Sequence, residues 1–131
     1  MVKIQEEKIN VLHYIELLKR NDAGSVIAFL GEPRRSSKDG KVISIKYTAY
    51  KSMAIKEMKK IEKEALSTNG IKDVVIVHRI GNIPLKEFSL FVGISSAHRK
   101  EGFEVCNMVV DKIKEGVPIW KEIKYEGSRN S

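Results

Sequence analysis

Residues 90–121 constrain the fold of this chain most, because they combine an apolar run, a helix-length pattern and a marked stop. Residues 90–94 are apolar and include phenylalanine and valine, which predicts a buried strand. Ser95 and Ser96 come next, and a serine can cap a helix by accepting a hydrogen bond from a free N–H group of its first turn. The segment should therefore begin as a strand, a tight turn and a helix.

The helix that follows is expected to have one apolar face. Its apolar side chains recur at intervals of three and four residues: Phe103, Cys106, Val110 and Ile113. Gly116 and Pro118 predict its end. At about 100° per residue from Phe103, Lys112 falls in solvent and Lys114 at the edge of the apolar face. Partial desolvation there would favour a neutral, reactive amine. From geometry alone, however, the favoured interpretation is that Lys114 only complements the helix C-terminus.

The first turn of the same helix is basic, with His98, Arg99 and Lys100 in succession. The helix macrodipole is already positive at this end, where carboxylates are usually favoured. Free backbone N–H groups and added cations together form an anion site. The alternative is a solvated basic turn whose charge is reduced by Glu101 and Glu104.

The rest of the chain predicts an α+β fold, with helices packed on a mixed, mainly antiparallel sheet. Two more helices are expected: residues 10–20, capped by Asn10, and residues 52–68, capped by Ser52. Further strands are expected at residues 25–30, 42–50, 74–80 and 123–125. The strand at 42–50 should pair antiparallel with the strand at 25–30. Residues 82–86 contain a proline and are expected to form a turn.

Residues 32–41 form the most loop-like stretch of the chain, with a proline, two serines, an Asp-Gly pair and four basic residues. One interpretation is a solvated hairpin loop, as most charged loops are. The other is a mobile basic flap that closes over an anion. Arg34 would then be the anchor, because a guanidinium group can bind phosphate in a bidentate way.

Five segments carry a resemblance to a known family: GEPR at 31–34, YTAYKSMA at 47–54, VIVHRIG at 75–81, SSAHRKEGFE at 95–104 and DKIKEGVPIWK at 111–121. In this order and spacing the chain resembles the large, catalytic subunit of molybdopterin synthase. The family pattern is an S-x-HR turn that opens a helix, a lysine near its end, and then P-x-W-K. The resemblance covers about residues 23–121 and is more specific than any one of these motifs.

The resemblance implies a set of site residues. Lys114 and Lys121 match the family's essential lysines and are expected to be catalytic, while Arg34, His98 and Arg99 are expected to bind substrate. Glu32 and Pro33 are possible contacts in the substrate loop, although many relatives have a basic residue where Glu32 stands. Relatives also carry a longer C-terminal tail. Arg129 is only a weak candidate for the contribution that this tail makes to the pocket.

The resemblance further implies an α/β-hammerhead fold and a sulfurtransferase activity that uses no cofactor. Sulfur would come from the C-terminal Gly-Gly thiocarboxylate of a small ubiquitin-like subunit. It would pass to cyclic pyranopterin monophosphate and form the dithiolene of molybdopterin, a step of molybdenum cofactor biosynthesis. The family assembles as a homodimer with one small subunit at each end, which makes a heterotetramer.

Composition sets limits on the alternatives. The 131 residues suit one domain, 1–131, and neither a signal peptide nor a membrane-length apolar run is evident. A single cysteine fits a cytoplasmic setting, and no Cys/His cluster suggests a metal site. The net charge of +7 favours an anionic partner. Nucleic acid is a weaker candidate, because the basic residues are dispersed.

A non-catalytic basic module that binds RNA or an acidic protein remains the alternative function. Its binding patch would consist of Lys112, Lys114, Lys121 and Lys124. Such binding would fall steeply with salt, and no single lysine would dominate.

Two further residues invite a chemical role. Cys106 could carry a persulfide, but its place on the apolar helix face favours a buried, inert thiol. His78 lies at the end of a predicted strand, where a structural role is the favoured interpretation over a catalytic one.

Overall fold

The computed structural model describes residues 1–127, so the tail from residue 128 and its candidate Arg129 lie outside the described residues. The elements are β1 (Val2–Gln5), α1 (Val11–Leu18), β2 (Ser25–Gly31), β3 (Ser36–Ser37), β4 (Gly40–Ala49), α2 (Lys51–Leu66), β5 (Ile71–Arg79), β6 (Gly81–Pro84), β7 (Leu90–Ser96), α3 (Arg99–Gly116) and β8 (Ile119–Tyr125). None of the helices in this range is long and apolar enough to cross a membrane.

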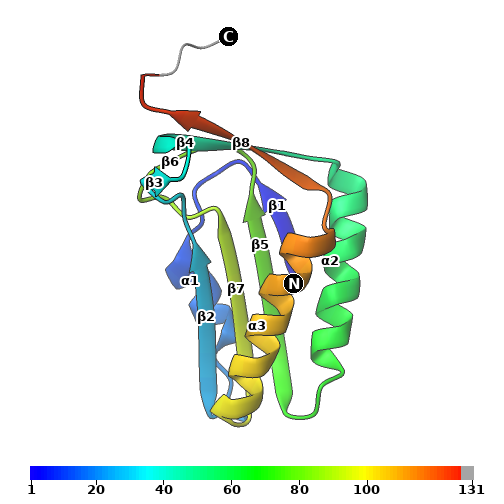
Figure 1. Ribbon diagram of the computed structural model, residues 1–131. Helices are drawn as coiled ribbons and strands as arrows, with labels where there is room; N and C mark the ends of the chain where they lie inside the picture. The colour runs from blue at the N-terminus through cyan, green and yellow to red at the C-terminus, as the bar shows by residue number, and fades with distance from the viewer. Residues whose placement is uncertain (128–131) are drawn as a thin grey trace.

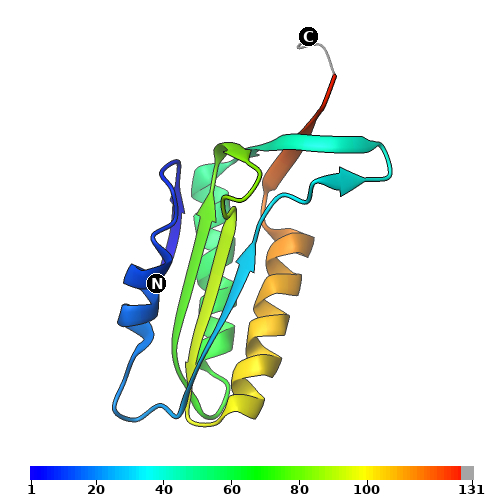
Figure 2. The same ribbon diagram turned by 90° about the vertical axis from the view of Figure 1, so that its left-hand side faces the viewer.

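A main sheet with the strand order β1-β5-β7-β2 forms the centre of the fold. Only the β1–β5 pair is parallel among the described strand pairs, and the others are antiparallel. Helices α2 and α3 cover one face and α1 covers the other (Figures 1 and 2). Alternate residues of β5 lie on opposite faces of the main sheet. Val74 and Ile76 belong to the core under α2 and α3, whereas Val75 and Val77 belong to the core under α1. The apolar runs of β5 and β7 are explained by this cover on both faces.

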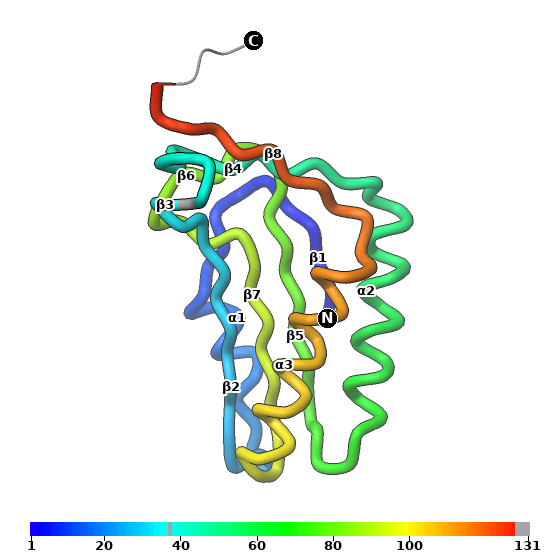
Figure 3. Tube along the Cα trace, in the orientation of Figure 1, coloured from blue at the N-terminus to red at the C-terminus, as the bar shows by residue number. Residues whose placement is uncertain are grey.

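A smaller sheet crosses one end of the main sheet. It has the order β3-β4-β6, and β8 also pairs with β4. The strands β4 and β8 run side by side across the top of the molecule (Figures 1 and 3). Mixed, mainly antiparallel sheets with packed helices confirm the predicted α+β class, and the crossing sheet fits the hammerhead arrangement that the resemblance implies.

Two predictions about strands are wrong. The strand β4 does not pair with β2, because β2 is paired with β7 along residues 25–31, and the chain leaves the main sheet after residue 31. Of the turn predicted at residues 82–86, only residues 85–86 form a turn, because residues 81–84 form the short strand β6, with Pro84 at its end. Proline is tolerated there because β6 lies at the edge of the small sheet. The strand β1 was not predicted, and it joins the sheet through β5.

The predicted caps are partly correct. The side chain of Asn10 accepts a hydrogen bond from the backbone N–H of His13 at 3.2 Å, which confirms this cap. Ser52 lies inside α2, and Tyr50, which precedes the helix, makes no side-chain capping bond.

The serines before α3 also have a different role from the predicted one. Both belong to β7: Ser95 Oγ donates to the carbonyl of Leu18 at 2.6 Å, and Ser96 Oγ donates to that of His98 at 2.7 Å. The N-terminus of α3 is capped by Glu101 instead. Its carboxylate accepts a hydrogen bond from the backbone N–H of His98 at 2.7 Å.

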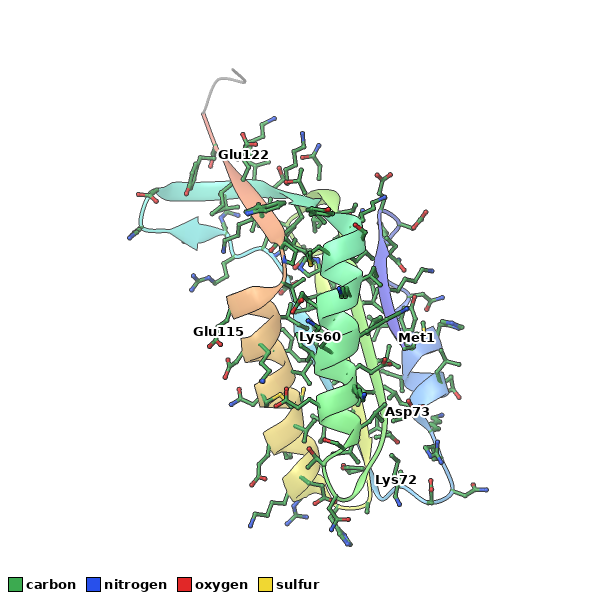
Figure 4. All side chains as sticks on the ribbon, turned by 90° about the vertical axis from the view of Figure 1, so that its right-hand side faces the viewer. Met1, Lys60, Lys72, Asp73, Glu115 and Glu122 are labelled. Atoms are coloured by element: carbon green, nitrogen blue, oxygen red, sulfur yellow. The ribbon has the colours of Figure 1, made fainter. Side chains whose placement is uncertain are left out.

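The buried face of α3 is rotated relative to the predicted one. Its buried residues are Gly102, Val105, Cys106, Val109, Val110 and Ile113, whereas Phe103 is 58% exposed. The predictions for the two lysines therefore change. Lys112 is solvent-accessible as expected, but it is paired, because its Nζ lies 2.8 Å from Glu64 of α2. Lys114 is exposed instead of partly desolvated. The cause is that α3 packs against both the main sheet and α2. Figure 4 shows this side of the molecule, with Lys60 on α2 and Glu115 on α3.

Candidate active site

A cavity of about 730 Å³ lies where the main sheet meets the small sheet. Its walls come from the ends of β2 and β5, the start of β7, the last turn of α3, and the facing strands β4 and β8. Three cationic side chains line it: Arg34, Lys114 and Lys121. This volume is typical of a site for a small organic ligand.

Lys114 reaches the cavity from the last turn of α3. Its Nζ lies 5.7 Å from the centroid of the Phe29 ring, which belongs to β2 and also lines the cavity. A cation over an aromatic face is attracted by the ring quadrupole. The ring therefore helps to hold the ammonium group at the cavity, although the lysine is exposed.

Lys121 reaches the same cavity from β8, because the chain reverses after α3. Val117 and Pro118 separate the helix from the strand, and Lys121 then stands opposite Tyr47 in the β4–β8 ladder. Side chains alternate along a strand, so Lys121 lines the cavity while its neighbour Trp120 is 57% exposed.

The loop after β2 contributes one cation and one carboxylate. Arg34 and Glu32 both line the cavity and are exposed, whereas Pro33 between them is buried and does not line it. An arginine at the mouth of the cavity can bind a phosphate group. The acidic Glu32 beside it reduces the positive charge at the same place.

The structure does not bring His98 and Arg99 to this cavity within one chain. Both stand at the N-terminal end of α3, whereas Lys114 lies in its last turn. An α-helix of 18 residues is about 27 Å long. The predicted site residues thus form two groups, with Arg34, Lys114 and Lys121 at one end of α3 and the basic turn at the other.

His78 also lines the cavity, although the sequence favoured a structural role for it. The residue is 6% exposed, its Nδ1 lies 2.8 Å from the Arg79 carbonyl oxygen, and its ring meets that of Tyr47 edge-on at 5.0 Å between centroids. Burial lowers the pKa of His78, so its imidazole is neutral near physiological pH. The available signal was its position at the end of a buried strand, inside the VIVHRIG motif.

Cys106 lies outside the cavity lining, on the buried face of α3. Burial raises the pKa of its thiol to about 11. Its Sγ lies 3.9 Å from the carbonyl oxygen of Val92. Only the thiolate is a good nucleophile, so a buried thiol with a raised pKa is inert. Cys106 therefore packs in the core, as the sequence suggested.

Fold and site together define a class of protein: an α+β domain with a cavity lined by three cationic side chains where two sheets meet. The family model of the MoaE protein matches residues 4–116. The molybdopterin synthase catalytic subunit of Thermoplasma volcanium is 40% identical over 99% of this chain and 95% of that protein. The subunit of the same name from Pyrococcus abyssi is 41% identical, over 92% and 82% respectively.

A solved structure agrees with these sequence relatives. The crystal structure of molybdopterin synthase from Staphylococcus aureus has a TM-score of 0.89 and 32% sequence identity, and the match covers 95% of this chain and 91% of that chain. The chain belongs to the MoaE family.

Proposed function

We propose that this chain, with residues 1–131 as one domain, is the catalytic subunit of a molybdopterin synthase. It transfers sulfur from the C-terminal thiocarboxylate of a small ubiquitin-like subunit to cyclic pyranopterin monophosphate. Two such transfers create the dithiolene of molybdopterin. One observation carries the proposal: Arg34, Lys114 and Lys121 converge on one cavity in a chain of the MoaE family.

Arg34 suits the phosphate end of the substrate. Its guanidinium group offers paired N–H donors that match two phosphate oxygens, and such charge-assisted bonds are strong. The loop that carries it extends from β2 at the mouth of the cavity.

His98 and Arg99 enter this scheme through a second copy of the chain. They lie too far along α3 to reach the cavity of their own chain. In a homodimer the basic turn of one protomer can complete the anion site of the other. This arrangement keeps all five of the expected site residues at one substrate without a change in the fold.

Lys114 and Lys121 suit the sulfur-transfer chemistry. A thiocarboxylate is an anion, so two cations that line the cavity attract it electrostatically. Attack by its sulfur on a carbonyl carbon of the pterin side chain forms a C–S bond and moves the C=O electron pair onto oxygen, where a fixed ammonium group stabilises the charge. Water then hydrolyses the thioester that joins the two molecules, so the sulfur stays on the pterin and the small subunit leaves as a carboxylate. The second lysine can supply or accept a proton. Sulfur arrives on the partner, so Cys106 takes no part.

Reconstitution tests the proposal directly. The protein is mixed with the thiocarboxylated small subunit and cyclic pyranopterin monophosphate, and molybdopterin is measured. Removing the last two residues of the small subunit should abolish turnover while much of the docking affinity remains. Turnover with the shortened partner would contradict insertion of the tail. No turnover with the intact partner, together with salt-sensitive RNA binding, would favour the basic-module alternative.

We further propose that the protein works in the cytoplasm. Its one cysteine is free and buried, so the described fold requires no oxidising compartment. Cell fractionation of the native protein checks this location, and recovery from an extracytoplasmic fraction would contradict it.

A further inference from the structure

The imidazole of His78 has a fixed tautomer. Its Nδ1 lies 2.8 Å from the Arg79 carbonyl oxygen, and a carbonyl can only accept a hydrogen bond. Nδ1 therefore carries the proton, and in the neutral ring Nε2 carries a lone pair. The ring is held in place by the edge-on contact with Tyr47.

The backbone that orients this ring is itself fixed. The side chain of Arg79 donates from Nη1 to Glu87 at 2.8 Å and from Nε to the carbonyl of Glu6 at 2.9 Å. The backbone N–H of Arg79 donates to the carbonyl of Ser89 at 2.8 Å. The carbonyl that accepts from His78 is thus part of a rigid strand end.

His78 lines the cavity and is 6% exposed, and its Nε2 makes no hydrogen bond to the described residues. Within residues 1–127, no fully buried side-chain nitrogen or oxygen atom lacks a partner. Nε2 is therefore not sealed in the core, and it keeps its contact with the cavity space.

Nε2 of His78 is a neutral hydrogen-bond acceptor, unlike the charged groups that line the same cavity. The cations Arg34, Lys114 and Lys121 can only donate hydrogen bonds. Glu32 can accept, but it is exposed on the loop at the mouth. The cavity thus combines donors for an anion with a deep, neutral acceptor.

We propose that His78 is a substrate-binding residue whose Nε2 accepts a hydrogen bond from an N–H group of the bound ring system. The three cations take the anionic part of the same molecule. This inference rests on the proposed function for the identity of the substrate, a reduced pterin whose ring carries N–H groups. A buried acceptor also gives specificity, because a ligand without the donor leaves Nε2 unpaired.

Two substitutions separate this role from a structural one. In His78→Asn the side-chain amide lies near the position of Nδ1, so it keeps the bond to the Arg79 carbonyl and removes the acceptor. In His78→Gln the amide reaches the position of Nε2 and can still accept. Binding to substrate should therefore favour Gln over Asn, whereas a purely structural role should favour Asn over Gln.

The measurement is calorimetric titration of the full-length protein with cyclic pyranopterin monophosphate, alongside inorganic phosphate. His78→Asn should weaken pterin binding by about tenfold or more and change phosphate binding by less than about twofold. His78→Gln should stay within about threefold of the wild type for both. Pterin binding by His78→Asn equal to the wild type would overturn the inference, as would a loss of kcat with unchanged affinity.

A measurement on the unmodified protein covers the case in which both variants fail to fold. In histidine labelled with ¹⁵N, His78 should show the tautomer with the proton on Nδ1, and its Nε2 signal should shift with the pterin but not with phosphate. A proton on Nε2, or no shift, would overturn the inference. Wild-type protein that neither binds nor converts the pterin would overturn the proposed function and this inference together. Normal turnover with an unresponsive His78 would overturn the inference alone.

Discussion

The ammonium group of Lys114 lies 5.7 Å from the centroid of the Phe29 ring, and this contact joins the last turn of α3 to β2 at the cavity. Helix geometry placed this lysine at the edge of the apolar face, where it would be partly desolvated, but the residue is exposed. Its position is defined instead by the aromatic face beneath it. A positioned charge and a diffuse basic patch give different results on mutation, which leads to the first prediction.

Lys114→Ala should reduce sulfur transfer at least about a hundredfold, or ~2.7 kcal/mol of barrier, as expected for loss of an acid–base or charge-stabilising group. Lys112→Ala is the matched control and should change turnover by less than about threefold, because Lys112 faces Glu64 of α2 and does not line the cavity. Lys114→Arg keeps the charge and the ring contact but cannot release a proton, so it should not restore activity.

Single-turnover assays with saturating small subunit measure these three variants, and melting curves exclude unfolding. Loss of the exposed Lys112–Glu64 pair should cost at most about 1 kcal/mol of stability. Equal, small losses for the two alanine variants would contradict a catalytic role for Lys114.

Mixing two inactive variants tests whether the cavity is shared between protomers. Arg99→Ala and Lys114→Ala should each be inactive as homodimers. If Arg99 acts across the dimer, a mixed dimer has one site with both residues intact, so random reassortment should restore about a quarter of wild-type turnover. If both residues act in the same chain, mixed dimers stay inactive. The assay follows turnover after subunit exchange, with separately incubated variants as controls.

Cys106→Ala should keep turnover within about twofold of the wild type and cost about 1 kcal/mol of stability, because the residue only packs against the core. Burial raises the pKa of this thiol to about 11, so little thiolate is present near neutral pH. Iodoacetamide should therefore label Cys106 quickly only after the protein is unfolded. A large loss of turnover in a variant with an unchanged melting temperature would instead indicate a sulfur-carrying cysteine.

Acid should destabilise the protein through His78. Burial lowers the pKa of His78 in the folded protein below its usual value of 6.5. Above that value the ring is neutral in both states, so it causes no pH dependence there. As the pH falls from about 6.5 toward the folded pKa, the unfolded chain gains a proton that the folded chain does not, and the free energy of unfolding decreases. Denaturant unfolding at about pH 8 and about pH 5 should show a larger loss for the wild type than for His78→Gln. Equal losses would exclude His78 as the cause.

Local pattern determined much of the secondary structure. The helix predicted at residues 52–68 corresponds to α2, whose buried residues recur at intervals of three and four: Ala54, Met58, Ile61 and Ala65. The Asn10 cap and the buried strands β5 and β7 were also predicted, because caps and periodicity depend on neighbours within a few residues. The resemblance carried by short motifs singled out Arg34, Lys114 and Lys121, which the structure places around one cavity.

Tertiary packing decided what local pattern left open. The apolar positions of α3 fit more than one rotation, and contact with both the sheet and α2 selected the one that exposes Phe103. The partners of β4 depend on segments far along the chain, so its pairing with β6 and β8 could not be inferred from its own alternation. His78 shows the same limit: the sequence placed it at a strand end, but only the crossing sheet, with Tyr47 on β4 and Lys121 on β8, makes that strand end the wall of a cavity.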